Sequence, residues 1–323
     1  MSIEKNKECE HYFTVMKVIN REFRRLVPKL REKGFYKSQE KRAIEWKEYT
    51  LSQINEVKLL DKIKLLVDSF DAIGTRSFGR PLTNPKDLTK AILVAELLGM
   101  PERQAQGWVN LLASKVGINS ILDDRTIGRA YSRLKVLEIL KQVFEKTKTS
   151  DGLLSGDGTG LETTRKQNYE TEKKKTENYL VSIVDSREIV QSFEMNNREC
   201  PAMHSIVKNV KGGILCLDAG FIDKELTREI SELGIKPFIF PKKNLDLNGS
   251  IHWKKMFLEL FYDTQNWLKI YHQRSHTESF HSSFKRKNKP LMKFNSFSKL
   301  VQLTARIIIH NLRKQNYYSM LEN

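Results

Sequence analysis

The sequence predicts a mixed α/β protein whose N-terminal half is entirely helical. Up to about residue 150, apolar residues recur at intervals of three and four with basic residues between them, which is the period of amphipathic helices. After residue 150, short runs of β-branched and aromatic residues alternate with helical segments. That change of period is typical of a mixed sheet flanked by helices.

Composition indicates a globular protein with a polyanionic partner. The chain has 323 residues, a length that suggests roughly two domains and a sizeable core. Lys and Arg number 56 against 39 Asp and Glu, so the formal net charge is +17 and the pI is about 9.6. Such an excess most simply indicates nucleic acid, although a basic protein without that partner remains an alternative.

Membrane and disulfide signals are weak. No apolar run approaches the roughly 20 residues that cross a bilayer, and the N-terminus lacks the plan of a signal peptide. We therefore expect a cytoplasmic protein with no membrane partner. Its three cysteines, Cys9, Cys200 and Cys216, are too few and too scattered for a disulfide framework or a zinc cluster.

Two helical regions are predicted before residue 150. Residues 1–80 form a basic segment of amphipathic helices, in which Pro28 and Gly34 interrupt the first pattern. The Gly- and Pro-rich stretch 71–85 predicts a loop or linker. Residues 81–150 predict short helices joined by tight turns, an arrangement that fits a helix-turn-helix placed against DNA.

The last helix predicted in this second region carries an arginine stripe. A helix over residues 126–140 would place Arg125, Arg129 and Arg133 at intervals of four on one face. The stripe fits contacts with DNA phosphates, and a solvated surface helix explains it about equally well.

Residues 151–323 predict the sheet. The expected order is strand, strand, strand, helix, strand, helix, strand, and then long helices. The runs at 179–185 and 188–195 form an antiparallel hairpin around a polar turn, and the apolar run at 212–221 contains a buried strand that ends in a carboxylate.

Two aspartates lie at the apparent ends of predicted strands. Asp157 in "LLSGDGTG" and Asp218 in "GILCLDAGF" are each followed by glycine within two residues. Small residues let a ligand approach, and α/β sheets carry their sites at strand ends. Asp157 alone is also compatible with a structural turn, whereas Asp218 follows five apolar residues and needs a partner.

A third carboxylate lies in "YHQRSHTESFHSSFK". Tyr271, Arg274, Glu278 and Lys285 follow the spacing Tyr-x2-Arg-x3-Glu-x6-Lys. On one helix, all four side chains would stay within an arc of roughly 60°. One interpretation is an exposed helix with mutually supporting charges. The other is a carboxylate that binds a metal ion beside a phosphate held by the cations.

The three carboxylates predict a hard metal ion. Acidic oxygens without histidine or cysteine suit Mg²⁺ or Mn²⁺. Two such ions about 3.5 to 4 Å apart activate a water or a 3′ hydroxyl and stabilise the leaving oxygen at phosphorus. The sequence therefore predicts phosphodiester chemistry. A zinc site at His272 and His276 is a less favoured alternative.

The "DGTG" and "LDAGF" motifs, together with the Tyr-x2-Arg-x3-Glu-x6-Lys spacing, resemble the DDE transposases of bacterial and archaeal insertion sequences, in particular the class with this signature. The resemblance covers about residues 150–315 and implies a ribonuclease-H-like catalytic core. It implies cut-and-paste transposition, in which Mg²⁺ or Mn²⁺ supports DNA cleavage at the element's ends and strand transfer into target DNA. The catalytic and metal-binding residues that it implies are Asp157, Asp218 and Glu278. The residues that it implies for contacts with DNA phosphates are Tyr271, Arg274 and Lys285.

The resemblance also implies partners and location. Double-stranded DNA, as terminal inverted repeats and as target, would be bound by a homodimer in a prokaryotic cytoplasm, at the nucleoid. Lys242 and Lys243, after a predicted strand, either touch DNA or are solvated. Trp253 and Trp267 are expected to pack in the core. The alternatives are a metal-dependent endonuclease without strand transfer, and a non-catalytic DNA-binding regulator derived from a transposase.

Overall fold

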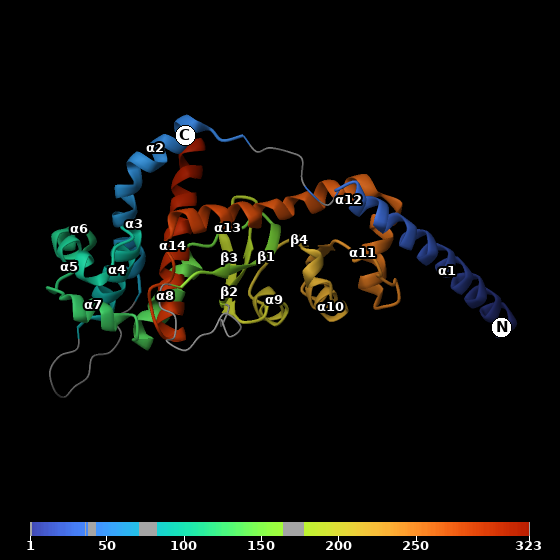
Figure 1. The fold of residues 1–323 in the computed structure, drawn as a ribbon, viewed down its shortest axis with the longest axis horizontal. Coiled ribbons are helices and arrows are strands. Elements are labelled where there is room, and N and C mark those ends of the chain that lie inside the picture. The colour runs from blue at the N-terminus through green and yellow to red at the C-terminus, as the bar shows by residue number, and fades with distance from the viewer. Residues whose placement is uncertain (1, 36, 38–42, 71–82, 164–177, 323) are drawn as a thin grey trace.

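The computed structural model describes residues 2–35, 37, 43–70, 83–163 and 178–322. Helices α2–α7 gather at one end of the molecule, the sheet lies in the middle, and α1 extends from the other end (Figure 1). Most of the predicted linker at 71–85 lies outside the described residues. Within the described part of the chain, no helix is both long enough and apolar enough to cross a membrane.

Five strands form one mixed sheet in the order β3-β2-β1-β4-β5. The strands are β1 (Leu153–Leu161), β2 (Asn178–Val184), β3 (Val190–Asn196), β4 (Ile214–Leu217) and β5 (Lys236–Ile239). Strands β1, β2 and β3 pair antiparallel, whereas β1, β4 and β5 run parallel. The predicted hairpin and the predicted order of strands and helices are confirmed.

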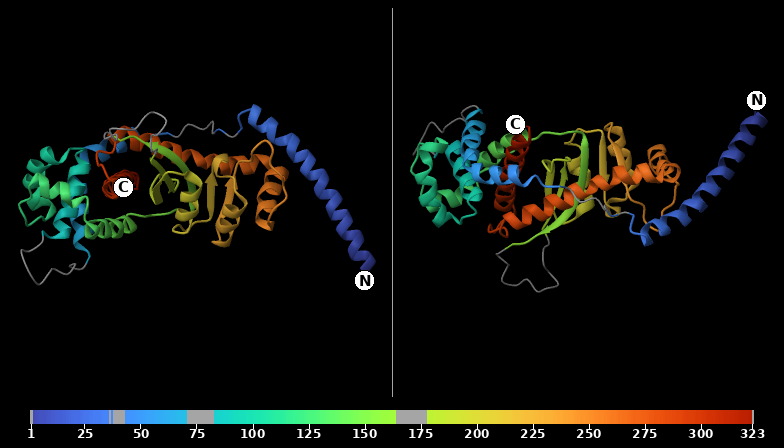
Figure 2. Two further views of the ribbon diagram at one scale, coloured as in Figure 1. Left: turned by 60° about the horizontal axis from the view of Figure 1, so that its bottom comes forward. Right: turned by 90° about the horizontal axis from the view of Figure 1, so that it is seen from above.

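Helices cover both faces of the sheet. Successive residues of β1 point to opposite faces, so their contacts show which helix lies on which face. On one face, a Cβ at Gly156 would meet Met203 of α9 (Glu199–Val207). On the other, Thr277 of α13 (Ser275–Lys287) donates a hydrogen bond to Ser155 at 2.7 Å. Figures 1 and 2 show α13 crossing one side of the sheet, with α9 and α10 (Lys224–Glu232) on the other.

The helical region shares a core with the C-terminal helix α14 (Ser296–Leu321). Its helices are α2 (Trp46–Ile54), α3 (Lys58–Asp68), α4 (Pro85–Leu97), α5 (Glu102–Leu111), α6 (Ala113–Val116), α7 (Asp124–Ala130) and α8 (Leu134–Lys146). Leu88 and Ile92 of α4 are fully buried, as are Ile307 and Ile308 of α14. Residues more than 200 positions apart in the sequence therefore form one hydrophobic core.

The predicted helix over 126–140 is wrong, because α7 ends at Ala130 and α8 begins at Leu134. Arg133 has extended backbone angles, φ −98° and ψ 124°, which no helix interior adopts. Buried Tyr131 at this corner donates a hydrogen bond to Glu96 at 2.7 Å. This tertiary contact accompanies a break that helical periodicity does not reveal.

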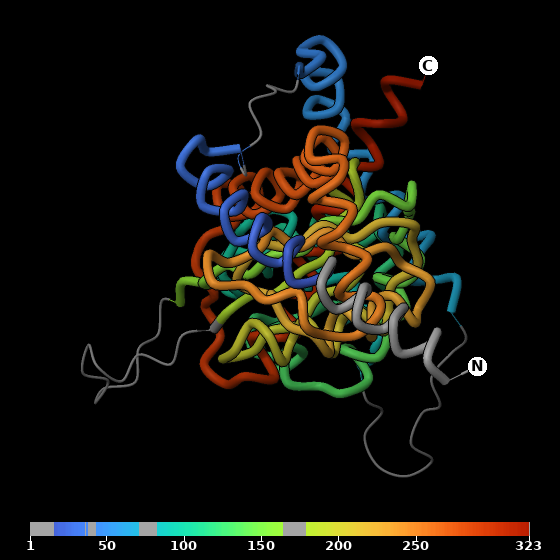
Figure 3. Tube along the Cα trace, turned by 90° about the vertical axis from the view of Figure 1, so that its right-hand side faces the viewer, coloured from blue at the N-terminus to red at the C-terminus, as the bar shows by residue number. Residues whose placement is uncertain are grey.

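The N-terminal helix α1 (Ser2–Glu32) packs against the sheet domain at the end of the molecule opposite the helical region (Figure 1). Buried Phe23 meets Phe257 of α11 (Ile251–Tyr262) edge-to-face at 5.6 Å. Figure 3 views the molecule from this end, with α1 in front. Pro28 does not interrupt α1, contrary to the prediction, because it removes a single backbone hydrogen bond close to the helix end. Gly34, with φ +68°, follows the end of the helix.

A buried polar network joins the helical region to α14. Glu96 and Arg306 are both nearly inaccessible to solvent, and Arg306 Nε donates to Glu96 Oε2 at 2.7 Å. Tyr131 and Gln302 both donate to the other carboxylate oxygen, at 2.7 and 2.8 Å. Arg306 also donates to the carbonyl oxygen of Lys289, in the connection between α13 and α14. We call these four side chains the Glu96 network: Tyr131, Gln302 and Arg306 all donate hydrogen bonds to the buried carboxylate of Glu96.

The turn between β2 and β3 contains a pH-sensitive carboxyl. Asp185 is buried and accepts hydrogen bonds from the backbone N–H groups of Arg187 and Ile189, at 3.0 and 2.8 Å. Burial raises the pKa of Asp185 from 3.8 to about 7. The unfolded chain therefore releases this proton at a lower pH than the folded chain. This group consequently makes folding less favourable as the pH rises from about 4 to 7.

We expect Asp185→Asn to remove this part of the pH dependence. At about 1.4 kcal/mol per pKa unit, the wild type should lose up to about 4 kcal/mol of stability through Asp185 between pH 4 and 7. The amide oxygen retains both backbone hydrogen bonds, so the variant should show a flatter dependence. Urea unfolding at several pH values measures the slope. Parallel slopes in the two proteins would contradict the expectation.

Candidate active site

Strand register brings the two predicted aspartates together. Gly156 of β1 pairs with Leu217 of the parallel strand β4, so the next residue of each strand is an aspartate, Asp157 or Asp218. The prediction that Asp157 lies at a strand end is wrong, since β1 continues to Leu161 through its pairing with β2. Strand β4 ends at Leu217 and leaves Asp157 without a neighbouring strand on that side. The two carboxyl groups therefore share one edge of the sheet.

Arg274 links Glu278 to this edge. Its Nη2 atom lies 2.7 Å from Glu278 Oε1, one helical turn away, and its Nη1 atom lies 3.7 Å from Asp218 Oδ1. The Arg274 side chain is 12% exposed, whereas the side chains of Asp218 and Glu278 are 45% and 52% exposed. A single inward-facing cation thus bridges carboxylates that come from a strand and a helix.

Asp157 lies in the electric field of the same groups. Burial raises its pKa to about 6, against the effects of a 2.8 Å hydrogen bond from the Gly158 N–H and of positive Arg274. The negative charges of Asp218 and Glu278 raise it further. Arg274, Asp218 and Glu278 thus lie close enough to Asp157 to influence its charge.

Tyr271, at the end of α12 (Thr264–Tyr271), is buried and does not share an exposed face with the rest of the signature. Its ring stacks on Trp267 at 5.2 Å and 18°, and Arg274 Cζ lies 6.0 Å from its centroid. The predicted single stripe is wrong, because a 3-10 turn at His272–Arg274 interrupts the α-helical period between α12 and α13. Tyr271 therefore lies in the core beneath Arg274, and burial raises the pKa of its hydroxyl.

The other aromatic and histidine residues near the signature are structural. The prediction that Trp253 and Trp267 pack in the core is confirmed, since they are 4% and 2% exposed. His272 Nε2 lies 2.7 Å from the carbonyl oxygen of Phe35, in the turn after α1. His276 Nε2 lies 2.8 Å from Gln273 Oε1. Each contact occupies one ring nitrogen, and among the described residues no group of three or more histidine, cysteine or acidic side chains stands close enough together to hold an ion.

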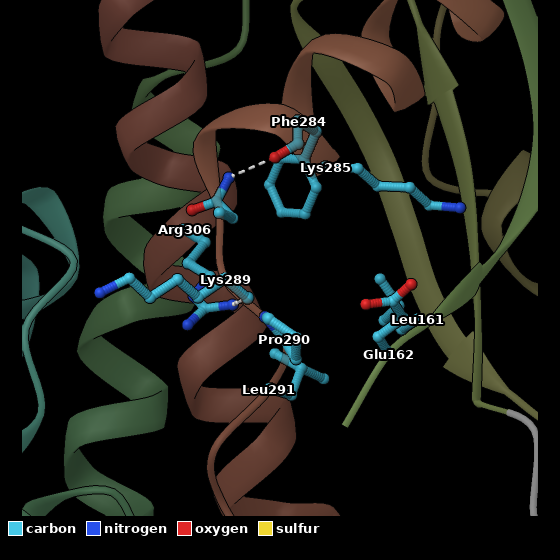
Figure 4. Close-up of a pocket in the computed structure, with 9 residues that line it drawn as sticks. Leu161, Glu162, Phe284, Lys285, Lys289, Pro290, Leu291 and Arg306 are labelled. Atoms are coloured by element: carbon cyan, nitrogen blue, oxygen red, sulfur yellow. Dashed lines mark hydrogen bonds between the residues drawn. The ribbon is translucent and has the colours of Figure 1, made fainter. Parts of the chain in front are cut away.

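Lys285 lies two turns beyond Glu278 on α13 and is exposed. It lines a partly open cavity of about 130 Å³ with Glu162, Phe284, Lys289 and Pro290. Figure 4 shows Lys285 extending from α13 toward the sheet. Buried Arg306 of the Glu96 network also lines this cavity, which therefore lies between the acidic cluster and the helical region.

The predicted arginines lie outside this cluster. Arg125 and Arg129 are exposed on α7, and Arg133 is half-buried at the start of α8. Figure 1 places α7 within the helical region, away from the end of the molecule that carries α12. The structure brings Arg125 and Arg129 onto one short helix and does not add Arg133 to it.

The predicted lysines lie in the loop after β5, where Lys242 and Lys243 are both exposed. Because β4 and β5 are parallel, this loop leaves the same edge of the sheet as Asp218. Backbone geometry thus places two exposed lysines on the side of the sheet that carries the acidic cluster.

Sequence reasoning missed Glu199. This half-buried residue begins α9, and its carboxylate contacts Gly158, the residue that follows Asp157. Burial, and next the charge of Asp218, raise the pKa of Glu199. An acidic residue in the first turn of a helix is common, so the sequence carried no signal that separated it from others.

The donor chemistry of the cluster fits a hard metal ion. Asp157, Asp218 and Glu278 offer carboxylate oxygens, with no thiol or imidazole among them, as Mg²⁺ and Mn²⁺ prefer. Among the described residues, no three acidic, histidine or cysteine side chains stand close enough together to hold an ion as they are placed. Arg274 lies between two of the carboxylates and acts as their counter-ion.

Competition between Arg274 and a metal ion leads to a prediction. Arg274→Gln should bind Mn²⁺ roughly tenfold to a hundredfold more tightly in the absence of DNA, because a unit positive charge within 4 Å of the ligands is removed. Isothermal titration calorimetry measures the affinity. Arg286→Gln, an exposed change on the same helix, is the matched control and should leave the affinity unchanged. Equal or weaker binding by Arg274→Gln would contradict the competition.

Fold and site together define a mixed α/β protein with an acidic site where two parallel strands meet a helix. The family described as "Transposase DDE domain" matches residues 149–312, just over half of the chain. The chain therefore belongs to this transposase family. A search of curated proteins gave no match.

Proposed function

We propose that this transposase cuts DNA at the ends of an insertion sequence and joins those ends to target DNA, with residues 151–323 as a ribonuclease-H-like catalytic domain. The observation that carries the proposal is the convergence of Asp157, Asp218 and Glu278 at one sheet edge, around Arg274. The family match supports a transposase. Strand order and the Tyr-Arg-Glu-Lys spacing support the more specific class.

In this proposal the three carboxylates hold Mg²⁺ or Mn²⁺. The bound ions would activate a water or a 3′ hydroxyl and stabilise the oxygen that leaves phosphorus. Arg274 would exchange its carboxylate partners for a DNA phosphate, which a guanidinium can bind through two parallel hydrogen bonds. Exposed Lys285 would hold the DNA backbone two turns away, and buried Tyr271 would support Arg274 from beneath.

Recognition of DNA would fall to the basic surfaces outside the cluster. The net charge of +17 provides the sequence-independent part of binding. We assign residues 81–150 to recognition of the terminal repeats, with Arg125 and Arg129 of α7 exposed for contacts with phosphates. Lys242 and Lys243 would contact DNA at the catalytic edge. Two ends must be joined, so a homodimer on DNA, in the cytoplasm of a prokaryote, completes the proposal.

A joining assay tests the proposed function. The full-length protein is incubated with duplexes that carry the ends of its own element and with a supercoiled target plasmid, with Mg²⁺ or Mn²⁺ and then with a chelator. We expect joined products that require the metal. Cleavage without joining would establish the metal-dependent endonuclease instead. Metal-independent binding without cleavage would establish the DNA-binding regulator.

A further inference from the structure

Glu199 lies on the face of the sheet opposite Glu278. Residues 155 and 277 meet on one face, so Gly158 of β1 points to the other face, where α9 begins. A Cβ at Gly158 would collide with Glu199 Oε1 and would lie 2.6 Å from its Cδ. The carboxylate therefore fills the space that glycine leaves open, next to Asp157 in the chain.

A second contact ties the start of α9 to the turn that carries Asp218. Cys200 Sγ lies 3.6 Å from the carbonyl oxygen of Gly220, two residues after Asp218. The backbone N–H of Gly220 donates to Asp218 Oδ2 at 3.3 Å. These two contacts hold the start of α9, which carries Glu199, against the turn that carries Asp218.

Glu199 also differs from its neighbours in having no counter-ion. Asp218 and Glu278 share Arg274, and Asp157 accepts a hydrogen bond from Gly158. Among the described residues, no hydrogen-bond donor or cation pairs with the carboxylate of Glu199. A half-buried carboxylate beside other carboxylates is costly unless a cation compensates it.

The helix macrodipole is the simpler explanation for an acidic residue in a first turn. Glu225 provides a comparison, since it occupies the first turn of α10. It is 55% exposed and pairs with Arg228, as expected for a residue that only stabilises a helix. Glu199 instead points at the sheet edge and fills the space over Gly158. The dipole alone does not account for that placement.

We propose that Glu199 is a fourth oxygen ligand of the acidic site and binds a divalent cation from the face opposite Glu278. It would act directly or through a bound water, beside Asp218, whose turn the start of α9 contacts. This inference deepens the proposed function and rests on it for the reaction, whereas the binding of the ion can be measured by itself. It also explains the glycine after Asp157, because any side chain at position 158 would displace Glu199.

Mn²⁺ binding to the full-length protein tests this proposal. Free Mn²⁺ is counted by electron paramagnetic resonance during titration of wild type, Glu199→Gln, Glu199→Asp and the matched control Glu225→Gln. We expect both Glu199 variants to lose roughly tenfold or more in affinity for at least one ion. The aspartate variant keeps the charge and shortens the reach, so it separates a ligand from a general field effect. Glu225→Gln should bind as the wild type does.

A variant that leaves all carboxylates intact provides a second measurement. Gly158→Ala should lower Mn²⁺ affinity as Glu199→Gln does, because the added methyl group displaces Glu199. Thermal unfolding confirms that each variant is folded. Mn²⁺ binding that is the same in wild type and both Glu199 variants, including no binding in any of them, overturns the proposal.

The joining assay keeps this proposal separate from the proposed function. Glu199-dependent Mn²⁺ binding without joined DNA would leave the fourth ligand in place and remove strand transfer. Joined DNA with Mn²⁺ binding unaffected by the Glu199 variants would support strand transfer and remove Glu199 as a ligand.

Discussion

Replacing Glu278 with glutamine is expected to slow DNA cleavage by roughly 10³-fold or more, which corresponds to about 4 kcal/mol in the activation barrier. The amide cannot supply the anionic oxygen that a divalent ion requires. Its oxygen still accepts the hydrogen bond from Arg274, and the side chain is 52% exposed, so the fold should survive. Cleavage of end-labelled duplexes measures the rate, and gel-shift binding without metal checks that DNA is still bound.

The same outcome is expected for Asp157→Asn and Asp218→Asn, since the three groups act as one unit. The asparagine at position 157 still accepts the hydrogen bond from Gly158, so the local backbone is retained. Glu232→Gln is the matched control, because Glu232 is exposed on α10, and it should cleave as the wild type does. Wild-type cleavage by any one of the three carboxylate variants would remove the triad from the proposed function.

Local sequence patterns were sufficient to predict a mixed sheet and the order of its strands and helices along the chain. The hairpin of β2 and β3 has the period of strands and a short polar turn. Both aspartates were found because they lie at apparent strand ends beside glycine, and Asp218 also follows an apolar run in which a charge needs a partner. Their adjacency depends on the register between β1 and β4, which pairs Gly156 with Leu217 and which no local pattern specifies.

Tertiary contacts explain what sequence reasoning missed. The break between α7 and α8 lies where Tyr131 reaches Glu96, a contact across 35 positions. Tyr271 is buried against Trp267 and against Phe240, which follows β5. Glu199 reaches the acidic site through the packing of α9 on the sheet. In each case a side chain's surroundings depend on an element that is distant in the sequence.

Replacing Arg306 with methionine is expected to destabilise the protein by about 3 to 5 kcal/mol, the usual cost of breaking a buried ion pair from one side. Glu96 would keep its hydrogen bonds from Tyr131 and Gln302 and lose its only cation among the described residues. The carbonyl oxygen of Lys289 would lose a donor as well. Urea unfolding followed by circular dichroism measures the change.

Arg228→Met is the matched control for Arg306→Met, because Arg228 pairs with Glu225 and Glu232 on the exposed face of α10. Such surface pairs contribute about 0 to 1 kcal/mol, so the control should unfold nearly as the wild type does. The double variant Glu96→Gln/Arg306→Met should recover part of the loss, since it removes the uncompensated charge. Equal effects of Arg306→Met and Arg228→Met would show that the Glu96 network does not hold the helical region to α14. A large effect confined to Arg306 would mean that the helical region, which we propose recognises DNA, and the connection beside Lys285 depend on one buried ion pair.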